Sequence, residues 1–130
     1  MDITKFKDLM SEEYTSMTWA EANDKIATIA SSATLQENLN ILQEELAELI
    51  QAVSKYNRNV PDSKYMLLEE IADVTLAIWC LRTAMSLEDE DMDHAYDIKL
   101  NRAYEGIKIE YITDGGVKFV KREGAEDGNE

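Results

Sequence analysis

The fold is decided by residues 35–56, which read LQENLNILQEELAELIQAVSKY. Large apolar residues recur in this stretch at alternating spacings of four and three: Leu35, Leu39, Leu42, Leu46, Leu49, Val53 and Tyr56. Such a repeat is typical of a helix that packs against other helices along one apolar seam. Thr34 and Glu37 have the spacing of a capping box at its start. We therefore expect a helix over residues 35–58.

A second stretch repeats this pattern. Its apolar residues keep the same alternating spacing: Leu67, Ile71, Val74, Ile78, Leu81 and Met85. Between Val74 and Leu81 only Thr75 is polar, so we expect the helix over 63–85 to be buried on nearly all sides. Enclosure of that extent in a chain of 130 residues predicts an oligomer interface, in a homodimer or a homotetramer.

The rest of the chain predicts further helices and a C-terminal segment in which apolar residues alternate with polar ones, as in a β-strand. We expect further helices over 19–31, 63–85 and 88–108, because N-cap candidates precede them at Thr18, Asp62 and Ser86 respectively. A weaker apolar pattern predicts a short helix over 3–13. After residue 106 apolar residues alternate around Asp114-Gly115-Gly116, which predicts a β-hairpin. We expect a mainly α fold with a four-helix bundle core. Its parts are an N-terminal arm or short helix (1–17), a helical domain (18–108), and a C-terminal hairpin with an acidic tail (109–130).

The composition excludes several classes of function. The chain has 27 acidic and 13 basic residues and a formal net charge of −14, which opposes binding to long nucleic acid or to an anionic membrane. One cysteine and one histidine exclude a disulfide framework and a cysteine-rich zinc site. The charged N-terminus and the lack of a long apolar run predict a cytoplasmic protein without a membrane span.

Two pairs of acids flank the two apolar seams. Glu45 and Glu48 each precede a seam residue of the first helix, and Glu70 and Asp73 do so in the second. Residues three apart lie on one helix face, about one turn from each other. If the helices are antiparallel, as a short connection favours, the four carboxylates converge beside the apolar contact.

Converging carboxylates raise one another's pKa unless a cation compensates them. An all-oxygen donor set suits Mg²⁺ or Mn²⁺, and the absence of a Glu-x-x-His pair argues against a di-iron bundle. A chain with 27 acids also carries such pairs by chance. A metal site and a solvated acidic face are therefore both open interpretations of the pattern.

The acids and their context resemble a known family. Glu44-Glu45-Leu46-Ala47-Glu48, followed by Glu70-Ile71-Ala72-Asp73, is similar to the EExxE…ExxD signature of the MazG-like all-α nucleoside triphosphate pyrophosphohydrolases, in their small, phage-type branch. The resemblance covers about residues 18–108 and extends to Asp97-Ile98-Lys99-Leu100-Asn101-Arg102.

This resemblance implies a Mg²⁺-dependent enzyme, with Mn²⁺ as a substitute, that cleaves (deoxy)nucleoside triphosphates to monophosphate and pyrophosphate. Such an activity serves the house-cleaning of the nucleotide pool. The resemblance implies metal ligands at Glu45, Glu48, Glu70 and Asp73, the four residues that flank the seams. It adds Glu44 as a fifth catalytic acid, with a role in orienting the site or acting on water.

Four further residues are candidates for contacts with the substrate. Lys55 lies seven residues after Glu48 and reaches either a phosphate or an acid of the cluster. Lys99 and Arg102 are better phosphate candidates, because an Arg fork suits phosphate oxygens, although both can also pair with nearby acids. Asn38 lies seven residues before Glu45 and is either a base or sugar contact or a polar flank. Trp19 either stacks on a base or packs in the core, and we expect it in the core.

Two hypotheses without catalysis compete with the enzyme. An acidic helical protein can bind a basic partner or mimic DNA, and the acidic residues of the tail fit that role. A purely structural oligomerisation bundle would also explain the apolar helix over 63–85. A response of stability to divalent metal separates both hypotheses from the enzyme.

Overall fold

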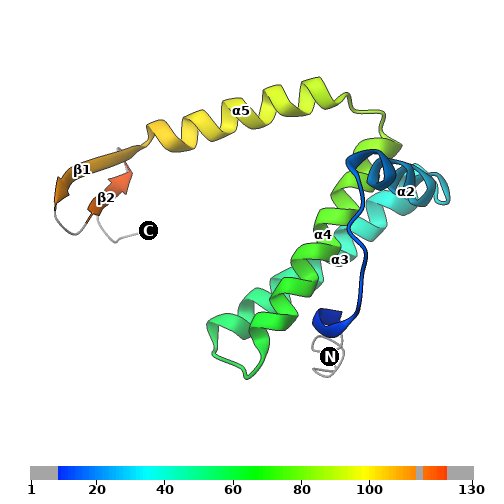
Figure 1. The fold of residues 1–130 in the computed structure, drawn as a ribbon, viewed down its shortest axis with the longest axis horizontal. Helices are drawn as coiled ribbons and strands as arrows, with labels where there is room; N and C mark the ends of the chain where they lie inside the picture. The colour runs from blue at the N-terminus through cyan, green and yellow to red at the C-terminus, as the bar shows by residue number, and fades with distance from the viewer. Residues whose placement is uncertain (1–8, 114–115, 123–130) are drawn as a thin grey trace. The chain divides into compact units, whose positions relative to one another are not determined.

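The structure is a computed structural model that describes residues 9–113 and 116–122 and the side chains of residues 9–107. The chain is mainly helical (Figure 1). In chain order the elements are α2 (Trp19–Ser31), α3 (Leu35–Asn57), α4 (Ser63–Ala84), α5 (Asp89–Glu105), β1 (Ile107–Thr113) and β2 (Gly116–Arg122). Residues 9–11 are also helical, whereas most of the helix expected over 3–13 lies outside the described residues.

Both predicted capping boxes are confirmed. The Thr18 hydroxyl accepts a hydrogen bond from the Glu21 backbone N–H, and the Glu21 carboxylate accepts one from the Thr18 N–H. Thr34 and Glu37 make the same reciprocal pair before α3. These caps satisfy N–H groups that a helix start would otherwise leave without a partner. The first residues of α2 and α3, Trp19 and Leu35, are therefore the ones predicted from the sequence.

Two other expected caps are wrong. Asp62 occupies the N-cap position of α4, but its backbone is left-handed, with φ of 60°, and its side chain makes no cap hydrogen bond. Ser86 also has positive φ, at 55°, and the N-cap residue of α5 is Glu88. The left-handed residues reverse the chain within short connections, a geometry that residue type alone does not predict.

The three helices α2, α3 and α4 form one unit, which ends at Leu87. α3 and α4 are antiparallel and pack along their length, and α2 packs on α4 (Figure 1). The small residues Ala52 and Ala77 are buried on α3 and α4, and small side chains let two helix backbones approach closely. α4 is also held to α2 by Trp79, whose ring lies edge-on to Trp19 at a centroid distance of 5.0 Å.

Two expectations about burial are wrong. α4 is not enclosed on nearly all sides, because Ile71, Leu76 and Ile78 are exposed. Trp19 is not a core residue but is more than half exposed, despite its contact with Trp79. In both cases the side chain is exposed because the three helices of this unit do not cover all of its apolar surface.

The second unit begins at Glu88 and contains α5, β1 and β2. β1 and β2 pair antiparallel, with Ile109 opposite Phe119 and Ile112 opposite Val117, and the register shifts between these pairs. The acidic tail expected at the C-terminus lies outside the described residues. Across the described part of the chain, no helix combines the length and the apolar character that crossing a bilayer requires.

Candidate metal centre

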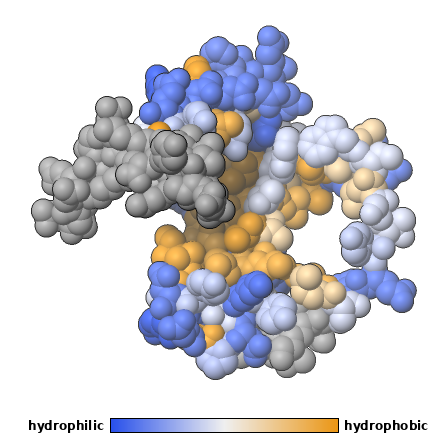
Figure 2. Space-filling model, turned by 60° about the vertical axis from the view of Figure 1, so that its left-hand side comes forward, coloured by the Kyte–Doolittle hydropathy of each residue, from blue (hydrophilic) through white to orange (hydrophobic). Residues whose placement is uncertain are grey.

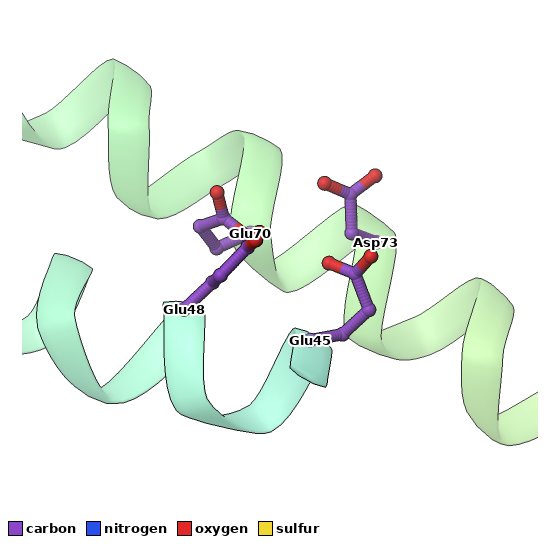
Figure 3. A group of neighbouring side chains, drawn as sticks. All are labelled: Glu45, Glu48, Glu70 and Asp73. Atoms are coloured by element: carbon purple, nitrogen blue, oxygen red, sulfur yellow. The ribbon is translucent and has the colours of Figure 1, made fainter. Parts of the chain in front are cut away.

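The four acids that flank the seams meet between α3 and α4. Glu45 and Glu48 project from neighbouring turns of α3, and Glu70 and Asp73 project toward them from α4 (Figure 3). Each of the four offers a carboxylate oxygen, and these oxygens all lie within 4.8 Å of one another. The antiparallel pairing of the helices produces this cluster because it places an acid pair on each helix at the same level.

The cluster is partly removed from solvent. Glu70 is 2% exposed, Glu45 and Asp73 are half-buried, and Glu48 is exposed. The Oε2 atoms of Glu45 and Glu70 are fully buried and accept no hydrogen bond from any described residue. A buried carboxylate oxygen without a donor is costly and needs a cation or a proton.

Burial and like charge both act on these carboxyl groups. Burial raises the pKa of Glu70 to about 7, and the charges of Glu48 and Asp73 add to the effect. Burial also raises the pKa of Glu45, with contributions from Asp73 and Glu48, and the pKa of Asp73, with a contribution from Glu48. The protein therefore gathers negative charge at a place where it is poorly solvated.

The donor set fits a hard divalent cation. All four side chains offer oxygen, the ligand that Mg²⁺ and Mn²⁺ prefer. The two buried oxygens without donors are available as ligands, and the exposed Glu48 leaves one side of the cluster open to water. A cation there would offset the repulsion that raises the pKa values.

A cavity of about 180 Å³ opens beside the cluster. Glu45 and Asp73 form part of its wall, and the remaining wall is mostly apolar, with Ile41, Ala77 and Cys80 among the lining residues. Burial raises the pKa of the Cys80 thiol, so this residue is an uncharged part of the wall. The arrangement joins an apolar recess to a negatively charged rim.

Asn38 is a buried structural residue that also borders the cavity. Its Nδ2 donates to the Ala30 carbonyl oxygen at 3.1 Å and to the Thr34 carbonyl oxygen at 3.0 Å. These bonds tie the end of α2 to the start of α3. Among the described residues nothing donates to its Oδ1, which therefore remains an acceptor at the cavity wall.

The structure places the other candidate residues as follows. Glu44 is exposed on α3, and its charge contributes to the raised pKa of Glu45. Lys55 is half-buried on α3, and no ion pair joins it to Glu48 or Asp73 within the described side chains. Lys99 and Arg102 are exposed on α5, in the second unit.

The sequence did not single out the cavity. Its lining comes from three helices, and the residues from α2 and the α2–α3 connection, Ile29, Ser32 and Ala33, form no motif with the acids. The one available signal was the small residue Ala77, four positions after Asp73, which leaves room beside a carboxylate.

Comparison of the chain with protein-family models, with curated proteins and with solved structures gives no match.

Proposed function

We propose that the protein hydrolyses (deoxy)nucleoside triphosphates to the monophosphate and pyrophosphate, with Mg²⁺ bound by Glu45, Glu48, Glu70 and Asp73. The observation that carries the proposal is the four-carboxylate cluster with two buried, donor-free oxygens. The order and spacing of the acids, which resemble those of the MazG-like pyrophosphohydrolases, supply the reaction class. The proposed role is the removal of unwanted nucleotides from the cytoplasmic pool.

The cluster would serve the reaction by charge and position. When bound, Mg²⁺ supplies neutralisation of the triphosphate and a lowered pKa of a coordinated water. The buried oxygens of Glu45 and Glu70 would hold the cation, and Glu48, at the exposed side of the cluster, would complete the donor set. Glu44, on the adjacent exposed position of α3, orients the attacking water.

Hydrolysis needs no covalent intermediate with the protein. Water forms a new bond to phosphorus, the α–β anhydride bond breaks, and pyrophosphate leaves with the bridging oxygen. Positioning and electrostatics dominate in such phosphoryl transfers. Carboxylates that fix a cation and a water are therefore sufficient, and no nucleophilic serine or cysteine is required.

The cavity is the proposed site of the nucleoside. Its apolar wall suits the faces of a base, and Glu45 and Asp73 connect it directly to the cluster that would hold the phosphates. Asn38 lines this cavity, and we propose that its side-chain oxygen accepts a hydrogen bond from the base or sugar. Lys55, on the same helix as Glu45 and Glu48, is proposed to contact phosphate oxygens.

The proposal is tested with a panel of ribo- and deoxyribonucleoside triphosphates incubated with the protein and Mg²⁺, with products followed by phosphorus NMR. We expect equal amounts of monophosphate and pyrophosphate. Release of orthophosphate with a diphosphate would show that a different bond is cut, and no turnover of any member with Mg²⁺ or Mn²⁺ would contradict the proposal.

A further inference from the structure

The cavity beside the carboxylate cluster has a wall of unusual hydrogen-bonding character. Much of that wall is apolar, but hydrophobic residues also gather in a band across the face of the molecule seen in Figure 2. An apolar wall alone therefore does not distinguish this cavity from the rest of the surface. Its few polar atoms do, because the polar groups of a binding pocket fix which ligand groups are accepted.

Asn38 offers a ligand only its side-chain oxygen. The residue is 4% exposed, and its Nδ2 atom donates to the carbonyl oxygens of Ala30 and Thr34. Since an amide nitrogen has two hydrogens, both are used. The amide cannot turn over, because the exchange of its two ends would place Oδ1 against the same two carbonyl oxygens. Asn38 therefore contributes a fixed acceptor to the wall.

The other polar groups of the wall also have no strong donor left. The Ser32 hydroxyl donates to the Ile29 carbonyl oxygen at 2.6 Å. The backbone N–H groups of the lining residues are used within the helices or at their ends. Glu45 and Asp73, when they hold a cation, only accept. Among the described residues of the wall, Cys80 alone keeps a side-chain hydrogen, and a thiol is a weak donor.

The fixed acceptor lies on the same helix face as the cluster. Asn38, Ile41 and Glu45 follow one another on α3 at spacings of three and four, so they share one face. Seven residues of helix span about 10 Å along the axis. A nucleotide with its phosphates at the cluster and its base in the cavity would therefore direct the far edge of the base toward Asn38.

The size of the cavity suits a base and not a whole nucleotide. Its volume is about 180 Å³. Pockets that enclose a complete small ligand begin at about 300 Å³. The polar atoms of the wall would therefore be in contact with the base, while the sugar and the phosphates lie outside the cavity.

We propose that this cavity selects nucleotides whose base carries an exocyclic amino group, as cytosine and adenine do, over the same rings with an oxo group. The inference rests on the proposed function, because it takes the cavity as the base site. An amino group supplies the hydrogens that the wall lacks, and one of them bonds to the Asn38 oxygen. An oxo group at that place would meet only acceptors and would leave two buried oxygens without a donor.

An oxo ring is disfavoured even where it keeps an N–H group. The N3–H of uracil lies between two carbonyl oxygens, and both would approach the acceptors of the wall together with it. The cluster acts in the same direction, because four carboxylates carry more negative charge than one divalent cation removes. The resulting negative potential favours the positive hydrogens of an amino group over a carbonyl oxygen.

The test compares dCTP with dUTP on the wild-type protein in the presence of Mg²⁺. We expect kcat/KM to be about 100-fold higher for dCTP, because a site built for a donor rejects the analogue that lacks it. The pair dATP and dITP makes the same change on a purine ring and should give a ratio in the same direction. A ratio near one, or a preference for the oxo form, in the pair that is cleaved faster would overturn the proposal.

Asn38→Ala removes the acceptor and should bring the ratio of dCTP to dUTP cleavage toward one, mainly by loss of activity on dCTP. Both rates are measured on one preparation, so any partial unfolding caused by the loss of the two structural hydrogen bonds affects them equally. Asn40→Ala, at an exposed position of the same helix, should keep the wild-type ratio. An unchanged ratio in Asn38→Ala would overturn the proposal, because the selection would then come from another group.

Binding of the monophosphates separates this inference from the proposed hydrolysis. Calorimetric titration with dCMP and with dUMP, both with Mg²⁺, should show tighter binding of dCMP. That result without cleavage of any triphosphate would support the inference and contradict the proposed function. Cleavage of dCTP and dUTP at equal rates would do the reverse, and the absence of both binding and cleavage would contradict both.

Discussion

Glu48 of α3 and Glu70 of α4 bring carboxylate oxygens within 4.8 Å of each other, although Glu48 is exposed and Glu70 is only 2% exposed. One carboxyl group of the pair is therefore in contact with solvent, and the other is buried next to it. Burial and the Glu48 charge together raise the pKa of Glu70, so without a cation this arrangement costs the folded state free energy. Functional sites often contain ionisable groups whose pKa values are shifted in this way, even though the shift destabilises the folded state.

Replacing Glu70 by glutamine should stabilise the metal-free protein. Glu70→Gln removes a buried charge, and its amide can donate to a neighbouring carboxylate, so we expect a gain of about 1–3 kcal/mol in the free energy of unfolding above pH 7.5. Urea denaturation in the presence of a chelator measures it. Glu90→Gln, at an exposed position of α5, serves as the control. Destabilisation by Glu70→Gln alone would mean that the Glu70 charge is compensated within the protein.

The stability of the metal-free protein should fall as the pH rises from 5 to 8. Glu70 has a pKa of about 7 in the folded state and 4.5 as its ordinary value, so the folded state binds more protons than the unfolded state in this interval. Folding is then favoured at the acidic end of the interval and loses stability as the pH passes through 7. Thermal melts with chelator across this range measure the trend, and stability that rises with pH would contradict the assignment.

Excess Mg²⁺ should reverse that trend. Protons compete with the cation for the same carboxylates, so stabilisation by Mg²⁺ should grow as the pH rises above 7. The same melts with Mg²⁺ in place of chelator test this expectation. A Mg²⁺ effect that is equal at pH 5 and pH 8 would mean that the cation binds elsewhere.

Removing one ligand charge should abolish turnover while preserving the helices. Glu48→Gln and Asp73→Asn should each lower kcat by at least about 100-fold, because both acids would hold the cation on which the reaction depends. Circular dichroism checks the fold, and Asp24→Asn, an exposed acid of α2, should retain full activity. Full activity in either cluster variant would remove these residues from the site.

Asn38 should be important for stability whatever the substrate. Asn38→Ala removes the donor of two hydrogen bonds, to the carbonyl oxygens of Ala30 and Thr34, at a buried position. We expect a loss of about 2 kcal/mol in the free energy of unfolding. Asn23→Ala, exposed on α2, should change it by less than about 0.5 kcal/mol at the same protein concentration. Equal effects would contradict the structural role of Asn38.

The sequence predicted the helices and the meeting of the acids because both follow from local periodicity. The capping boxes at Thr18 and Thr34 place the starts of α2 and α3, and the fixed offset between acids and seams predicts that Glu45, Glu48, Glu70 and Asp73 converge. The expectation for Asp62 as a side-chain cap failed because a left-handed backbone at that position turns the chain, which residue type does not reveal.

The sequence could not predict which side of the hairpin is covered. It placed Ile71 and Ile78 in a helix enclosed on nearly all sides, whereas both side chains are exposed. Burial depends on which elements pack on a face, and in this unit α2 covers the other side of α4. The cavity beside the acids escaped prediction for the same reason, since its walls come from three helices.

The central claim is that the carboxylates of α3 and α4 bind a divalent cation, and calorimetric titration with Mn²⁺ tests it most directly. The wild type should show saturable binding, and so should a control in which Glu90→Gln is combined with Asp91→Asn on α5. The combination of Glu48→Gln with Glu70→Gln, which removes the same amount of charge from the cluster, should abolish that binding. Equal Mn²⁺ binding by all three proteins would contradict the claim, because the cation would then respond to overall acidity and not to this cluster.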